Sequence, residues 1–116
     1  MSKIELSEYK SAEFIKEKSS SDGINVVNFS GDWCGPCVAM RPDIRELDTD
    51  DVGFDVFMID VKANPDEAAR LGVRGVPAFF VYENGELKGS FTGRTTGEMF
   101  ARRVHATVAG EPDPAR

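Results

Sequence analysis

The sequence contains no long apolar run. No segment approaches the roughly 20 consecutive apolar residues that a helix needs to cross a bilayer. Residues 1–6 include the charged residues Lys3 and Glu5 and lack the apolar stretch of a signal peptide. We therefore expect no membrane association and a cytoplasmic protein.

The 116 residues suit one domain, predicted over residues 1–110, and residues 111–116 form a short, proline-containing tail that we expect to be flexible.

Basic residues are also scarce. Lysine and arginine number 14 against 20 aspartates and glutamates, which gives a net charge of −6. A nucleic-acid-binding surface needs a basic stripe, so we expect no nucleic-acid partner. Acidic residues gather at Asp48, Asp50, Asp51 and Asp55, and we interpret them as a solvated face rather than a docking site for basic partners. No repeat or second domain is evident, and we expect a monomer.

Cysteine occurs only twice, at Cys34 and Cys37, directly after an apolar segment. A helix that begins at this pair would place both thiols on one face, close enough to form a disulfide. A helix N-terminus also lowers the pKa of a nearby thiol, and the thiolate is the reactive species. The spacing therefore predicts a reversible dithiol switch. The alternative is half of a structural zinc site, but zinc needs four ligands, and the other soft ligand, His105, lies far along the chain.

Strand and helix patterns alternate along the chain. Short apolar segments predict strands at residues 24–30, 54–60 and 76–82, with a short edge strand at 3–6. An Asn84-Gly85 turn predicts an antiparallel return over residues 86–92. Helices are expected at 8–18 after an N-cap at Ser7, at 34–47, from Asn64-Pro65 to Gly72, and from a capping box at Thr95–Glu98 to Gly110.

The resulting order is β-α-β-α-β-α-β-β-α. Strands separated by helices are expected to be parallel, whereas the Asn84-Gly85 turn makes the last pair antiparallel. We therefore predict an α/β fold with a central mixed sheet of about five strands and helices on both faces.

These motifs resemble the thioredoxin family over nearly the whole chain. The matching residues, in the family's order and spacing, are Trp33-Cys34-Gly35-Pro36-Cys37, Asn64-Pro65, Arg74-Gly75-Val76-Pro77, Asn84-Gly85 and Gly93. The resemblance implies a thioredoxin fold and a thiol–disulfide oxidoreductase that reduces disulfide-containing protein substrates. It also implies no cofactor beyond the Cys34–Cys37 pair, and a thioredoxin reductase as the partner that restores the dithiol.

The resemblance assigns a role to each motif. Cys34 would attack the substrate disulfide, and Cys37 would resolve the mixed disulfide. Gly35 and Pro36 would set the turn that starts the helix, and Trp33 would shield the sulfur atoms and contact the substrate.

A second set of residues would bind the substrate. Val76-Pro77 would form a cis peptide that faces the disulfide, pairs through its backbone with an extended substrate and bars metal from the thiols. Gly75 and Gly93 would keep that surface flat. The alternative for Pro77 is an ordinary trans proline at the entry to a strand.

Four positions depart from the family pattern. Asn28 stands where the family has a buried aspartate, Met58 where it has a lysine, Ser30 where it has a second tryptophan, and Val38 where it has another lysine. The aspartate is the base that helps to deprotonate the resolving thiol, and an asparagine cannot take up that proton. We therefore hypothesise that Cys37 resolves mixed disulfides slowly. Two other functions stay open: a thioredoxin-fold adaptor with slow or incidental redox activity, and an oxidant or isomerase, which the Gly-Pro dipeptide disfavours.

Overall fold

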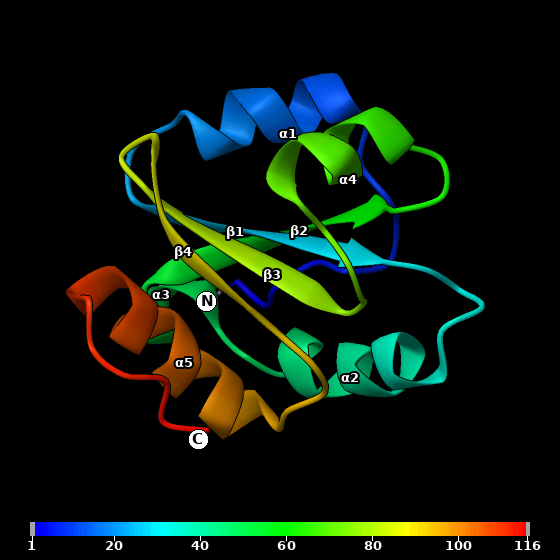
Figure 1. The fold of residues 1–116 in the computed structure, drawn as a ribbon. Coiled ribbons are helices and arrows are strands. Elements are labelled where there is room, and N and C mark those ends of the chain that lie inside the picture. Colours follow the sequence, from blue (N-terminus) through cyan, green and yellow to red (C-terminus); the bar gives the residue numbers. More distant parts are fainter. Residues whose placement is uncertain (1, 116) are drawn as a thin grey trace.

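A four-stranded mixed sheet forms the centre of the computed structural model, which describes residues 2–115 (Figure 1). Its strands are β1 (Ile24–Ser30), β2 (Phe54–Asp60), β3 (Ala78–Glu83) and β4 (Glu86–Thr92). They lie in the order β2-β1-β3-β4. β1 is parallel to β2 and antiparallel to β3, and β4 is antiparallel to β3. The predicted α/β class and mixed sheet are confirmed.

The predicted edge strand at residues 3–6 is wrong. Lys3 forms only an isolated bridge with Asp48, and the Ile4 N–H donates to Leu47 O at 3.1 Å. Ile4 and Leu6 are buried, at 2% and 1% exposure, so the alternating pattern reflects core packing rather than sheet pairing. The segment lies against the connection that precedes β2, so the sheet has four strands instead of about five.

The expected parallel direction of β3 is also wrong, since β3 runs antiparallel to β1. The helix between β2 and β3, α4 (Pro65–Leu71), has only seven residues and is about 10 Å long. It is too short to carry the chain back along a seven-residue strand of about 23 Å. The chain therefore enters β3 at the edge where β2 ends.

Helices cover both faces of the sheet, as expected (Figure 1). α1 (Ala12–Ser19) and α4 lie on one face, and α2 (Gly35–Arg45) and α5 (Gly97–Ala109) lie on the other. A short helix, α3 (Thr49–Val52), precedes β2. Because strand side chains alternate between faces, the core divides into two clusters. One contains Ile15, Val27, Phe29, Ile59, Ala68 and Phe80, and the other contains Val26, Met40, Ile44, Val56, Met58, Phe79, Phe100 and Val104.

Two helices begin later than predicted. The N-cap of α1 is Ser11 rather than Ser7, and its Oγ accepts the Phe14 N–H at 3.1 Å. The Lys10 N–H donates to Met58 O at 2.7 Å, which ties the segment before α1 to β2. In α5 the N-cap is Thr96 rather than Thr95, and the Asn64 side chain makes no capping hydrogen bond to α4.

The end of the chain lies against α5. The Asp113 carboxylate accepts hydrogen bonds from Arg103 Nε at 3.0 Å and from Arg103 Nη2 at 2.8 Å. Arg103 is buried, donates to Thr92 O at 3.2 Å and lies over the Phe91 ring at 4.3 Å. Flexibility of this tail stays a prediction, and these contacts give the tail a defined attachment. Within residues 2–115, no helix has the length and apolar character to cross a membrane.

Candidate active site

Four connections meet at one edge of the sheet. Ser30 at the end of β1 lies opposite Asp60 at the end of β2, and Phe29 lies opposite Ala78 at the start of β3. Ala78 in turn lies opposite Thr92 at the end of β4. The connections 31–34, 61–64, 72–77 and 93–96 therefore leave the sheet side by side. The two cysteines lie in this group of connections and at the start of α2.

The cysteines form a disulfide at the N-terminus of α2, as the spacing predicts. Cys34 is the N-cap, Gly35 and Pro36 open the first turn, and Cys37 follows within it. The two Cα atoms are 5.3 Å apart, and Cys34 Sγ accepts the Cys37 N–H at 3.3 Å. Both cysteines are buried, and Cys34 is the more exposed residue of the two, at 7% against 3% for Cys37.

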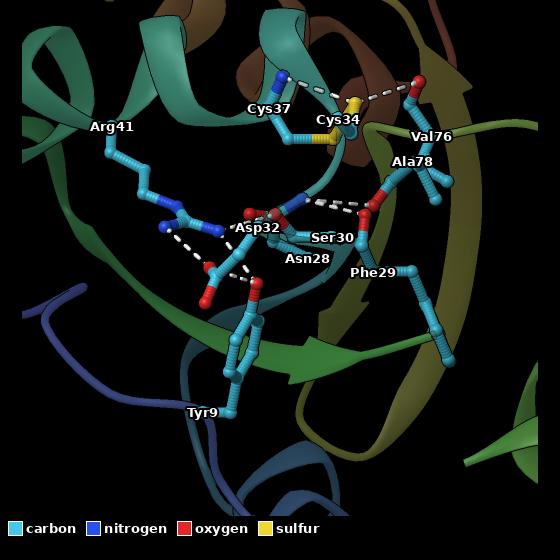
Figure 2. The surroundings of a disulfide bond; sticks show 10 residues. All are labelled: Tyr9, Asn28, Phe29, Ser30, Asp32, Cys34, Cys37, Arg41, Val76 and Ala78. Atoms are coloured by element: carbon cyan, nitrogen blue, oxygen red, sulfur yellow. Dashed lines mark hydrogen bonds and ion pairs between the residues drawn. A yellow bond between two sulfur atoms is a disulfide. The ribbon is translucent and has the colours of Figure 1, made fainter. Parts of the chain in front are cut away.

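The predicted cis peptide Val76-Pro77 is present. The Val76 carbonyl oxygen points to the disulfide (Figure 2). Val76 O lies 3.8 Å from Cys34 Sγ. The Gly93 N–H donates to Pro77 O at 3.0 Å, and Gly93 has a φ of 94°, which favours glycine. Gly75 is exposed on the same loop. The four residues predicted to bind substrate therefore lie on two linked connections, and one of them, Val76, adjoins Cys34.

Trp33 is the largest exposed side chain next to the sulfur atoms, at 56% exposure. Its indole lies against Gly31, where an added Cβ would come within 2.6 Å of Trp33 Cε2. Lys62 Nζ lies 4.4 Å from the centre of the indole, close enough for a cation–π interaction. Sequence analysis missed both neighbours, because neither belongs to a recognisable motif. Val38, which follows Cys37, is also exposed, at 42%.

Asn28 and Met58 are buried neighbours on β1 and β2, at 3% and 2% exposure. Asn28 Nδ2 donates to Phe29 O at 3.2 Å and to Ala78 O at 3.3 Å (Figure 2). The side chain thus bridges β1 and β3 close to the disulfide. Both acceptors are carbonyl oxygens, which requires a donor at this position.

A polar cluster that sequence analysis missed lies on the other side of the disulfide (Figure 2). Arg41, one helical turn after Cys37, donates to Tyr9 Oη at 2.7 Å and to Ser30 Oγ at 3.2 Å. It also forms an ion pair with Asp32 at 3.0 Å, and Tyr9 Oη donates to the same carboxylate at 2.8 Å. The only available signal was the spacing of Arg41 from Cys37.

The cluster shifts the titration of its members. Hydrogen bonds from Tyr9 and then Arg41 hold the pKa of Asp32 below its ordinary value. Burial, followed by the hydrogen bond to Asp32, raises the pKa of Tyr9. Asp32 precedes Trp33, so the ionised carboxylate ties the connection before the cysteines to α2.

Among residues 2–115, no group of three or more histidine, cysteine, aspartate or glutamate side chains is placed to hold a metal ion. His105 lies on α5, with Nε2 2.6 Å from Val52 O and its ring against Phe54.

Comparison with known proteins decides the family. The model of the family described as Thioredoxin matches residues 5–106. The chain belongs to the thioredoxin family. It is 32% identical to a thioredoxin of Rhodospirillum rubrum over 100 residues, which cover 84% of this chain and 94% of the relative. It is 37% identical to thioredoxin 1 of Chlorobaculum tepidum over 79 residues, which cover 67% of this chain and 78% of the relative.

A solved structure agrees with this assignment. A mutant thioredoxin from Halobacterium salinarum superposes with a TM-score of 0.75 at 25% identity, covering 85% of this chain and 87% of the other. Family membership and the bonded cysteine pair make the protein a thiol–disulfide oxidoreductase, and the family acts as protein-disulfide reductases. The family also implies disulfide-containing protein substrates and reductase partners.

Proposed function

We propose that Cys34 is the attacking sulfur and Cys37 the resolving sulfur in the reduction of protein disulfides. In the dithiol form, the Cys34 thiolate attacks one sulfur of the substrate, the substrate S–S bond breaks, and the departing sulfur takes up a proton. The Cys37 thiolate then attacks Cys34 Sγ, and the second substrate thiol leaves with another proton. The substrate gains two electrons and two protons, and the Cys34–Cys37 disulfide forms.

The observation that carries this proposal is the position of Cys34 as the N-cap of α2. The Cys37 N–H already points to Cys34 Sγ at 3.3 Å and would stabilise a thiolate there, together with the positive end of the helix. The greater exposure of Cys34, 7% against 3%, supports the order of attack. Gly35 and Pro36 serve by starting the helix at this point.

An extended substrate segment would bind along the loop of Gly75, Val76 and Pro77. Gly93 supports this loop through its hydrogen bond to Pro77 O. Backbone pairing at Val76 would place a substrate sulfur near Cys34, because Val76 O already lies 3.8 Å from Cys34 Sγ. Trp33 would cover the other side of the bound segment.

Asn28 and Met58 would support the site without taking part in proton transfer. Both Asn28 donor hydrogens are directed to backbone carbonyls, and an amide does not act as a base at neutral pH. We propose that the Cys37 proton passes to water or to Cys34, which slows resolution of the mixed disulfide.

The proposed setting is a cytoplasmic monomer that a thioredoxin reductase returns to the dithiol form. The cysteine pair is the only redox group that the reaction requires, and no nucleic-acid or membrane partner is proposed. The family supports a reductase in general, and coupling to NADPH through a purified thioredoxin reductase tests the specific partner.

Reduction of a protein disulfide such as insulin, followed by turbidity, tests the function. The protein with a reductase or dithiothreitol should accelerate reduction, and Cys34→Ser should abolish the acceleration. Binding of partners without any reduction would favour the adaptor function instead. A redox titration against glutathione separates a reductase from an oxidant. The cysteine pair of an oxidant has the higher reduction potential, so it would stay largely in the dithiol form where that of a reductase is oxidised.

A further inference from the structure

Charged side chains in the connections are segregated between the two edges of the sheet. At the edge with the disulfide, the connections 31–34, 61–64, 72–77 and 93–96 carry Asp32, Lys62, Arg74 and Arg94. At the opposite edge, the connections 20–23, 46–53 and 84–85 carry Asp22, Glu46, Asp48, Asp50 and Asp51, and no basic residue. A chain of net charge −6 therefore carries three basic residues in the group of connections that includes its reactive cysteines.

Lys62, Arg74 and Arg94 are called the cationic rim here. All three residues are exposed. Within residues 2–115, none of them forms an ion pair with an acidic side chain. No carboxylate of the described residues therefore neutralises their charges, which are available to a bound molecule.

The two acidic residues that follow β1 and end β2, Asp32 and Asp60, already accept hydrogen bonds from other groups. Asp32 is held by Arg41 and Tyr9. Asp60 Oδ1 accepts the N–H groups of Lys62 and Ala63 at 2.9 Å and 3.3 Å. Neither carboxylate forms an ion pair with the cationic rim.

One member of the cationic rim contacts the site directly, and the other two lie next to site residues in the chain. Lys62 Nζ lies over the indole of Trp33, which adjoins Cys34. Arg74 precedes by two residues Val76, whose carbonyl oxygen lies 3.8 Å from Cys34 Sγ. Arg94 follows Gly93, whose N–H donates to the same loop at Pro77 O. A segment bound at Cys34 would therefore meet positive charge from three different connections.

We propose that the cationic rim selects acidic substrates, that is, polypeptide segments in which aspartate or glutamate flanks the reducible disulfide. This inference rests on the proposed function and names the substrate class of the same site. Opposite charge raises the rate of encounter and fixes the orientation of the segment, whereas like charge suppresses a wrong partner. A basic segment would meet uncompensated like charge beside Cys34.

Three synthetic peptides test the inference. They share one intramolecular disulfide and one length, and carry two glutamates, two glutamines or two lysines beside the cysteines. Rate constants for their reduction by the dithiol protein are followed through Trp33, which is the only tryptophan of the chain and adjoins Cys34. The glutamate peptide should react roughly fivefold faster than the lysine peptide at low ionic strength. The difference should shrink at about 0.5 M salt, where exposed charges are screened.

Charge-matched variants locate the preference. Lys62→Gln/Arg74→Gln/Arg94→Gln should reduce the three peptides at similar rates. The control Lys3→Gln/Lys18→Gln/Lys88→Gln removes the same charge outside these connections and should keep the wild-type preference. Lys62→Arg should also keep it, because the cation over Trp33 remains.

The outcomes separate this inference from the proposed function. Equal rates for the three peptides in the wild type would contradict selection of acidic substrates by the cationic rim. The same loss of preference in both triple variants would also contradict it. Failure of the wild type to reduce even the glutamine peptide would overturn the proposed function instead. If the rim variant does not fold, the wild-type preference and its salt dependence decide, since a preference unchanged by salt contradicts a charge mechanism.

Discussion

At the scale of single residues, Asn28 shows how one side chain combines structure and chemistry. Its amide donates to carbonyl oxygens on two strands, Phe29 O and Ala78 O. The sequence reveals the departure from the family pattern but not these two acceptors, which come from strands far apart in the chain. A carboxylate at this position would place an acceptor against two acceptors in a buried site.

Asn28→Asp should lower the free energy of unfolding by about 1–3 kcal/mol at neutral pH. Burial and the two carbonyls would raise the pKa of the new carboxyl above that of the unfolded chain, so the fold would hold the proton more tightly. Stability should therefore fall as the pH rises from about 4. Urea denaturation at several pH values measures the effect. Asn84→Asp is the control, because Asn84 is exposed and its Oδ1 already accepts the Gly23 N–H at 2.8 Å. An equal pH dependence in both variants would contradict the argument.

A change at position 28 should also affect the rate at which Cys37 resolves the mixed disulfide. Asn28→Asp/Met58→Lys restores a base and its cationic neighbour, and should speed resolution of the mixed disulfide by Cys37 near neutral pH. Stopped-flow measurement of release of the second substrate thiol checks this. Unchanged rates would show that the lack of a base at position 28 is not what limits resolution by Cys37.

Asp32 should make the fold sensitive to acid. Because its pKa is held below the ordinary value in the folded protein, its contribution to stability is complete above about pH 4 and is lost as the pH falls through the folded value. Thermal unfolding of Asp32→Asn should therefore depend less on pH between about 4 and 2 than that of the wild type. Asp66→Asn, outside the cluster, should keep the wild-type slope; the same flattening there would rule out the Tyr9–Asp32–Arg41 contacts as its source.

At the scale of helices and strands, local sequence signals predict where a helix ends better than where it begins. Gly72 and Gly110 end their helices with positive φ, and the Asn84-Gly85 turn closes the hairpin, all as the sequence predicts. These ends depend on the conformation of one or two residues. The start of α1 depends instead on the Lys10 N–H bonding to Met58 O, a tertiary contact that no local pattern contains.

The start of α5 gives a direct test of this difference. Thr96 Oγ1 accepts the Met99 N–H at 3.3 Å, so Thr96→Ala should lower the free energy of unfolding by about 1 kcal/mol. Thr95→Ala, which alters the residue that sequence analysis favoured, should have a smaller effect. Chemical denaturation of both variants compares them, and a larger loss for Thr95→Ala would restore the predicted capping box.

At the scale of the whole molecule, the motif order was enough to predict the α/β class, the mixed sheet and the pairing of Cys34 with Cys37. The strand count and the direction of β3 were not predictable in the same way. Polar and apolar residues alternate over residues 3–6 as they do in a strand. The seven-residue length of α4 determines the direction of β3 only once the order of the strands in the sheet is known. The Arg41 cluster joins three segments, so it too depends on the finished fold.

The contact between Arg103 and Asp113 should fasten the end of the chain to the domain. Arg103 has a side-chain exposure of 9%, so Asp113→Asn leaves a largely buried cation poorly compensated and should cost about 1–3 kcal/mol. Glu111→Gln is the control and should cost far less. Denaturation together with limited proteolysis of the tail measures both, and equal stability of the two variants would show that the Arg103–Asp113 contact does not stabilise the fold.

Covalent trapping of a substrate tests the division of labour between the two sulfur atoms most directly. Cys37→Ser should accumulate a mixed disulfide with a protein substrate through Cys34, visible as a reducible adduct by mass spectrometry. Cys34→Ser should accumulate none, because the remaining cysteine, Cys37, is only 3% exposed and lies within the helix. An adduct on Cys37 in the Cys34→Ser variant, with none on Cys34 in the other, would contradict the proposed mechanism.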